Sequence, residues 1–321
     1  MNIRLKISIA AAALCLAGGA VAQAYPSKPI RIVIGFPPGG AIDTIARVLG
    51  PKMTADLGQA VVIENRGGAG GVIGMQAVAQ AAPDGYTVFL GTMGNFSITP
   101  ALVKDLPYNV QKDFTPVTQV ASTGFVLYVS PQLPVKTVAE LVAYAKANPQ
   151  KMNFSSSGNG GLPHMAGEMF NAAAGTKITH VAYKGSSPSI NDVVGGQAQL
   201  TFESVAIGMP LVKTDRLRAV ATTGTTRMTL LPDVPTVAES IPGFTVKNWF
   251  GIAAPAGTAA DRVNRLQASI AKALRDPEMV KTLAGLGVDP VGDTPVQFST
   301  YIRTESERWQ KLISSSGIKI D

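Results

Sequence analysis

The stretch that decides the fold is residues 30–43, which read IRIVIGFPPGGAID. Its apolar run, at 30–36, contains a single arginine and is typical of a β-strand buried on both faces of a parallel sheet. Paired prolines and glycines at 37–40 break this strand, and apolar residues then recur at helical spacing, beginning with Ile42 and Ile45. The stretch therefore predicts a strand, a turn and a helix, with the turn at the carboxyl end of the strand.

The same alternation of strands and helices continues along the chain and predicts an α/β fold. Further strands are expected at residues 61–64, 86–91, 125–129, 152–156, 179–182, 198–202 and 217–221, and helices at 72–81, 138–148, 163–173, 189–194, 259–275, 277–284 and 295–314. The sequence contains no internal repeat and no long flexible linker. It indicates two halves, each a mostly parallel sheet flanked by helices, with boundaries near 122–124 and 247–251.

The composition excludes several classes of protein. The chain has 321 residues, of which 46% are hydrophobic and 15% charged, with a formal net charge of +7. Its long uncharged apolar run lies at 7–22, and nothing after this run approaches the about 18 residues that a transmembrane helix requires. The single cysteine, Cys15, cannot frame a disulfide-rich mini-protein, and no cluster of Lys and Arg with interleaved aromatic residues points to a nucleic-acid partner.

The N-terminus has the pattern of a secretory signal peptide. Arg4 and Lys6 provide its positive region, and the apolar stretch that follows ends in Ala-Gln-Ala at Ala24. We expect a signal peptide over residues 1–24, cleavage after Ala24 and export to the periplasm. A lipid-modified Cys15 is not expected, because the leucine before it is bulkier than the small residue that such processing needs.

Two glycine-rich loops that lead into predicted helices are candidate anion sites: the first loop, residues 36–43, and the second loop, residues 155–161. A residue without a Cβ lets its N–H approach a ligand closely, and a helix N-terminus offers unpaired N–H groups with a favourable dipole. Residues 39–41 and 158–161 could therefore cradle a carboxylate or a phosphate. The alternative is that these glycines only turn the chain.

Nucleotide, metal and cofactor sites are not predicted. The glycines at 65–74 lack the G-x-G-x-x-G spacing, and no glycine-rich loop ends in Gly-Lys-Ser/Thr. His164 and Glu168 lie one helical turn apart, but a metal site needs further ligands that the sequence does not supply. His180 lies in a predicted strand and is expected to be structural.

Asp43 has several possible roles. It could stabilise its helix through the dipole, brace the first loop, or face a cleft and accept a hydrogen bond from a ligand. An exported hydrolase could use Asp43, His164 and a serine of the second loop, but the spacing places no base beside a nucleophile and no G-x-S-x-G motif is present. A non-catalytic protein is therefore expected.

A family resemblance rests on segments spread from about residue 25 to 320. They are YPSKPI at 25–30, FPPGGAID at 36–43, ENRGGAGG at 64–71, APDGYT at 82–87, WFGIAAPAGT at 249–258, and the Arg-Trp pair at 308–309. With them the chain resembles the periplasmic solute-binding proteins of tripartite tricarboxylate transporters, the Bug or TctC-like family. The resemblance implies a type II-like Venus flytrap, with residues 25–123 and 248–321 in lobe 1 and residues 124–247 in lobe 2.

The resemblance also implies how a ligand is bound. Loop amides at 39–43 and 157–161, with bridging waters, would hold a small carboxylate: a di- or tricarboxylate, an aromatic acid or an acidic amino acid. We expect ligand contacts from Phe36, Gly39, Gly40, Ala41, Asp43, Thr92, Asn95, Ser157, Gly158, Asn159, Gly160, Gly161, His164 and Lys184. The expected protein partners of this monomer are the membrane subunits of a tripartite tricarboxylate transporter or, alternatively, a sensor protein.

Overall fold

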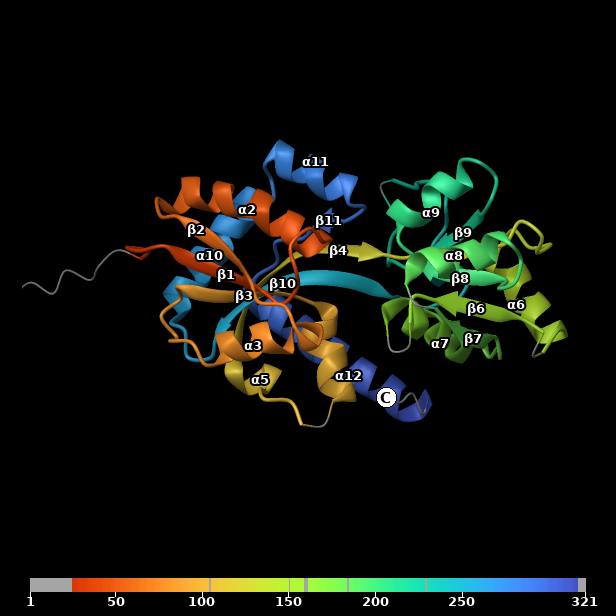
Figure 1. Cartoon of the computed structure of the whole chain (residues 1–321), viewed down its shortest axis with the longest axis horizontal. Helices are drawn as coiled ribbons and strands as arrows, with labels where there is room; N and C mark the ends of the chain where they lie inside the picture. The colour runs from red at the N-terminus through yellow and green to blue at the C-terminus, as the bar shows by residue number, and fades with distance from the viewer. Residues whose placement is uncertain are drawn as a thin grey trace, which may run out of the picture.

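The structure is a computed structural model that describes residues 25–103, 105–149, 151–158, 161–183, 185–228 and 230–316. It contains two sheets, one of six strands in the order β11-β4-β10-β3-β1-β2 and one of five in the order β7-β6-β8-β5-β9. Figure 1 shows the two sheets with their helices as two lobes side by side, joined by β4 and β10. The predicted two-lobed α/β fold is confirmed.

The first lobe is built around the six-stranded sheet. Its elements are β1 (Ile30–Ile34), α2 (Ala41–Leu57), β2 (Val61–Asn65), η1 (Ala69–Gly71), α3 (Val72–Ala79), β3 (Thr87–Thr92), η2 (Gly94–Ile98), α4 (Thr99–Leu102), α5 (Val110–Asp113), β4 (Phe114–Gly124), β10 (Lys247–Pro255), α10 (Ala260–Ala273), α11 (Pro277–Gly285), β11 (Asp289–Pro290) and α12 (Pro295–Ser316).

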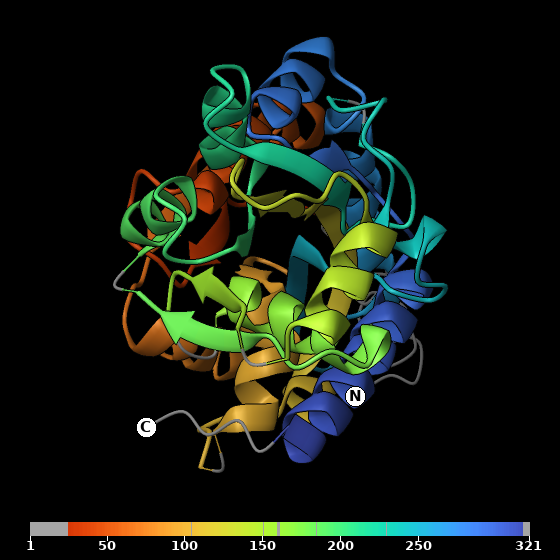
Figure 2. The same cartoon turned by 90° about the vertical axis from the view of Figure 1, so that its right-hand side faces the viewer.

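The second lobe is built around the five-stranded sheet. Its elements are β5 (Val126–Val129), α6 (Val138–Ala147), β6 (Asn153–Ser156), α7 (Leu162–Ala174), β7 (Thr179–Ala182), α8 (Ser186–Val194), β8 (Leu200–Glu203), α9 (Val205–Val212), β9 (Arg218–Thr222) and η3 (Val237–Glu239). Figure 2 views the molecule from the side of this lobe.

Both sheets are mixed, which corrects the expectation of mostly parallel sheets. Strand β1 is parallel to β2 and β3, and β6 is parallel to β7 and β8. The other pairs, β10 with β3 and β4, β11 with β4, and β5 with β8 and β9, are antiparallel. The βα units thus supply the parallel pairs, while β4, β5 and β10, which connect the lobes, pair antiparallel to their neighbours.

Aromatic side chains of the first lobe form a packed core around the start of β10. Trp249 is fully buried, with its ring stacked on Phe96 at 5.6 Å between centroids and edge-on to Phe298 at 5.4 Å. Helix α12 lies beneath both lobes in Figure 1, and the Arg308 guanidinium donates to the Thr245 carbonyl oxygen. Burial of these large side chains fixes how β10 and α12 sit where the lobes meet.

Within the described residues, no helix combines the length and apolar character that crossing a bilayer requires.

Candidate functional site

Strand directions place both glycine-rich loops where the lobes face each other. The last residue of β3, Thr92, pairs with Phe250 near the start of β10, and β1 runs parallel to β3. In the second lobe the last residue of β8, Glu203, pairs with Val126, the first residue of β5, and β6 runs parallel to β8. The carboxyl ends of β1 and β6 therefore point toward the connection between the lobes from opposite sides (Figure 1).

The first loop presents an uncapped helix N-terminus. Gly39 has a φ of 96°, a conformation that favours glycine, and Gly40 precedes α2 in an extended conformation. No side chain caps α2. Gly39, Gly40 and Ala41 are exposed, and a Cβ added at either glycine would meet no atom within 4 Å. The amides of Ala41 and Ile42, which have no partner within the helix, are thus open to a ligand.

Asp43 braces this loop from inside. Its Oδ2 accepts from the Gly39 amide at 3.0 Å and from Arg47 Nε at 2.8 Å, and its Oδ1 accepts from Asn65 Nδ2 at 3.0 Å. The Arg47 hydrogen bond, followed by those from Gly39 and Asn65, outweighs burial and lowers the pKa of Asp43 to about 2. Because the Gly39 amide already donates to Asp43, it is not free to donate to a ligand in this conformation. Ligand contacts by Gly39 and Asp43 stay predictions.

Arg47 and Asn65 support the first loop, although the sequence alone did not single them out. Asn65 ends β2 and donates both to Asp43 and to the Phe36 carbonyl oxygen at 3.0 Å, so it ties the first loop to the neighbouring strand. Arg47 lies four residues after Asp43 on α2, a spacing that favours an ion pair and that could have been found in the sequence. Phe36 itself is half-buried.

Thr92 and Asn95 form an internal clamp at the end of β3. Asn95 is 1% exposed; its Nδ2 donates to the Gly70 carbonyl oxygen at 2.8 Å, and its Oδ1 accepts from Thr92 N and Oγ1 at 3.0 and 3.1 Å. These contacts hold the η1 turn against β3, and they occupy polar groups that we expected to reach a ligand. Ligand contacts by Thr92 and Asn95 stay predictions.

The second loop also leads into an uncapped helix. Ser157, Gly158 and Gly161 are half-buried, Gly161 precedes α7, and no side chain caps this helix. The Gly185 amide, just before α8, donates to the Ser157 carbonyl oxygen at 3.1 Å and so joins two loops of the second lobe. The predicted contacts Asn159, Gly160 and Lys184 lie outside the described residues.

Both histidines of the chain lie beneath the second loop. The His164 and His180 rings are parallel, with 3.7 Å between centroids, and His180 Nε2 lies 2.6 Å from Ser156 Oγ. That hydroxyl oxygen accepts from the Gly158 amide at 3.2 Å. Burial, with a further contribution from His164, lowers the pKa of His180 to about 4. His164 is 7% exposed and supports the base of the loop; its ligand contact stays a prediction.

The hydrogen bonds do not assemble the group expected of a hydrolase. Asp43 bonds within the first lobe, whereas His164 stacks on His180 in the second. Ser156 does meet an imidazole, but its side chain is fully buried and unavailable to a substrate. Across the part of the chain that the structure describes, no group of three His, Cys, Asp or Glu residues could hold a metal ion.

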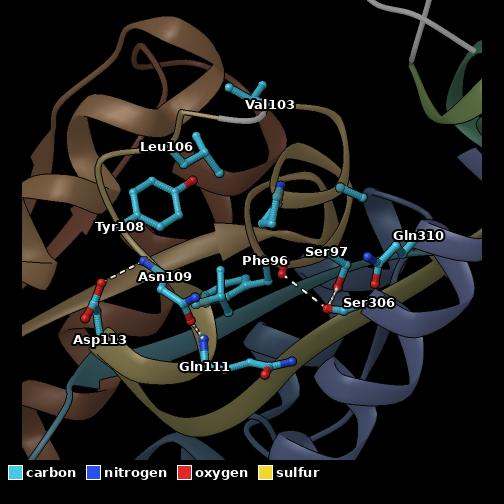
Figure 3. A pocket seen from close by; sticks show the side chains of 13 residues that line it. Phe96, Ser97, Val103, Leu106, Tyr108, Asn109, Gln111, Asp113, Ser306 and Gln310 are labelled. Atoms are coloured by element: carbon cyan, nitrogen blue, oxygen red, sulfur yellow. Dashed lines mark hydrogen bonds between the residues drawn. The ribbon is translucent and has the colours of Figure 1, made fainter. Parts of the chain in front are cut away.

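A separate cavity of about 590 Å³ lies in the first lobe, between η2, the α4–α5 segment and α12 (Figure 3). Phe96, Tyr108 and Ser306 are among its lining residues, and none of the predicted ligand contacts is. The Ser306 hydroxyl lies 3.3 Å from Ser97 Oγ. No residue of either loop lines this cavity, so it is distinct from both.

Comparisons with known proteins agree with this architecture. The sequence model of the TctC family, described as tripartite tricarboxylate transporter family receptor, matches residues 45–318. Protein BugT of Bordetella pertussis strain Tohama I is 35% identical over 325 residues, and the alignment covers 100% of both chains. Rpa4515 of R. palustris, solved with adipate, is 32% identical with a TM-score of 0.74, covering 92% of this chain and 99% of that one. MatC (Rpa3494) of Rhodopseudomonas palustris, solved with bound malate, is 31% identical with a TM-score of 0.69, covering 90% and 100%.

Proposed function

This chain belongs to the tripartite tricarboxylate transporter receptor family, TctC, and we propose that it is a non-catalytic receptor that captures a small carboxylate between its lobes. The family is one of periplasmic solute-binding proteins. The observation that carries the proposal is the pair of uncapped, glycine-preceded helices, α2 and α7, on facing sides of the two lobes. Two similar proteins hold adipate and malate, both dicarboxylates, which supports the same ligand class here.

Backbone amides would supply the anion site. The N-terminus of a helix carries about half an elementary positive charge, and among the described residues no side chain caps the N-terminus of α2. The second loop would offer the amides before and within the first turn of α7 from the opposite side. Because Pro163 in that turn has no N–H, α7 presents fewer donors than α2.

Closure would couple binding to recognition by a partner. A ligand that touches both loops binds the closed form better than the open form, so it shifts the population toward closure. We expect the lobes, residues 25–123 with 248–321 and residues 124–247, to move about β4–β5 and β10. Because closure excludes water from the site, it strengthens the amide hydrogen bonds. The membrane subunits of a tripartite tricarboxylate transporter would recognise the closed form. Alternatively, a signalling partner would recognise it.

The proposal includes export. Residues 1–24 would be removed as a signal peptide after Ala24, and the mature monomer would act in the periplasm.

The test is a calorimetric titration of the purified mature protein with adipate, malate, citrate, glutamate and benzoate. At a hundred times its dissociation constant, a bound ligand raises the free energy of unfolding by about 2.7 kcal/mol, which a thermal shift detects. The neutral diamide of adipate serves as the control and should not bind, because it presents no anion to the amides. Absence of binding across the whole carboxylate panel would overturn the proposal.

A further inference from the structure

Glu203 is a buried acid on the interlobe side of the second lobe. It ends β8, the central strand of its sheet, and its side chain is 4% exposed. Its Oε1 accepts from the Ser204 amide at 2.8 Å, which draws the carboxylate toward the carboxyl end of the strand. In the described part of the chain, no cation and no second hydrogen-bond donor reaches it.

The position of Glu203 is fixed by its neighbours. Strands β6 and β8 are parallel and pair Ser155 with Thr201; β6 ends one residue after this pair, at Ser156, and β8 ends two residues after it, at Glu203. Glu203 thus lies beside the beginning of the second loop. Val205, two residues later, lies 3.5 Å from where a Cβ on Gly287 of the first lobe would stand, so this end of β8 is directed at the first lobe.

Asp43, in the other lobe, is a buried carboxylate that has several hydrogen-bond donors, and it can be compared with Glu203. It accepts from Gly39, Arg47 and Asn65, and Arg47 supplies a positive charge. Glu203 is equally buried but has one neutral donor. Since a buried charge is costly unless it is paired, Glu203 retains an unused capacity to accept hydrogen bonds from a cation.

We propose that Glu203 binds an ammonium group of the ligand, so that the protein prefers a carboxylate bearing a nearby amine, as an amino acid does, over a plain dicarboxylate. The inference rests on the proposed function, because the loop amides must hold the carboxylate. Glu203 and the second loop would then bind the two charges of a zwitterion side by side. A carboxylate bound by the second loop without an adjacent ammonium group would instead be repelled by Glu203.

The test compares ligand pairs that differ only by the amine: glutamate with glutarate, aspartate with succinate, and leucine with 4-methylpentanoate. In calorimetry the wild-type protein should bind at least one amino acid about ten- to a hundredfold more tightly than its partner, the range of a charge-assisted hydrogen bond. Glu203→Gln keeps the shape and the acceptor for Ser204, and it should remove that preference. Glu307→Gln, an exposed acid on α12, controls for the loss of one charge and should leave the preference intact.

The possible results distinguish failure of the Glu203 ammonium site from failure of the proposed carboxylate receptor. If plain carboxylates bind as tightly as their amino partners, or if Glu203→Gln leaves the ratio unchanged, the inference is overturned while the carboxylate receptor stands. If no member of any pair binds, the inference is overturned as well; the receptor proposal fails with it only if adipate, malate, citrate and benzoate also do not bind. Thermal unfolding of unliganded Glu203→Gln checks that the α9 end of the lobe remains folded, so a lost preference cannot be attributed to unfolding.

Discussion

The two glycine-rich loops have similar backbones but are supported by different chemistry. The first loop rests on an ionic brace, in which Asp43 holds the Gly39 amide and is itself held by Arg47. The second loop rests on a neutral brace, in which Ser156 holds the Gly158 amide and is held by His180. Each lobe thus supports its own glycine-rich loop with its own side chains.

The two braces differ in how they respond to pH and to the loss of a charged partner. Asp43, with a pKa of about 2, stays charged throughout the physiological range. His180, with its pKa lowered to about 4, is neutral at pH 7 but can be protonated in mild acid. The first loop is therefore sensitive to the loss of charge partners, and the second to pH.

The largest expected effect comes from filling the first loop. Gly40→Val places a side chain beside the first-turn amides of α2, at a φ of −81° that valine tolerates and where nothing lies within 4 Å. We expect more than about a hundredfold loss of carboxylate affinity, equivalent to about 2.7 kcal/mol, with the fold retained. Gly285→Val, at an exposed glycine of α11 that is equally unobstructed, is the matched control and should bind normally. Calorimetry decides, and normal affinity in Gly40→Val would remove the first loop from the site.

The ionic brace is tested by Asp43→Asn. The amide side chain keeps one acceptor but loses the charge, leaving Arg47, Gly39 and Asn65 imperfectly paired, and we expect about 1–3 kcal/mol less stability in urea unfolding. The control is Asp261→Asn, an exposed acid in the first turn of α10 that offers only a dipole interaction. Equal losses in the two variants would show that Asp43 is no more than a helix-dipole partner.

The sequence predicted the βα units well, because their apolar runs are local signals. It extended the first strand to residue 36, whereas β1 ends at Ile34. At Gly35 a Cβ would lie 2.6 Å from the Gly71 Cα, and this close approach of two backbones cannot be read from either segment alone. The strand β4 and the helix α9 were not predicted: β4 mixes polar residues with Pro116, and α9 contains Gly208 and Pro210.

Tertiary contacts explain these misses. Strand β4 owes its conformation to pairing with β10 and β11, which follow it by more than a hundred residues. In α9, Gly208 admits the Tyr128 ring, since a Cβ there would lie 2.1 Å from it. The same holds for the site: the Asp43–Arg47 spacing is local, but the meetings of Asn65 with Asp43 and of Ser156 with His180 arise from strand neighbours.

The neutral brace predicts a pH effect that the ionic brace does not. Because the folded pKa of His180, about 4, lies below the unfolded value near 6.5, the unfolded chain binds more protons between these limits. Stability from this group is present above about pH 6.5 and is lost as the pH falls toward 4. We expect the free energy of unfolding to fall more steeply over that window in the wild type than in His180→Gln, measured by urea titration at each pH. His164 and Glu168 face His180 and remain in both proteins, so parallel curves would exclude His180 as the source.

The smallest expected effect concerns the charged partner of Asp43. Although the Arg47 hydrogen bond is the first cause of the low Asp43 pKa, the Arg47 side chain is 52% exposed, and solvent screens such a pair. Arg47→Gln should therefore lower the free energy of unfolding in urea by clearly less than Asp43→Asn does, and this loss should shrink in high salt. Arg227→Gln breaks a pair with Glu239 at a similar exposure of 47% in the second lobe, and it should cost about as much. A loss in Arg47→Gln as large as that in Asp43→Asn would mean that the charge pair, rather than the hydrogen bonds from Gly39 and Asn65, holds the first loop in place.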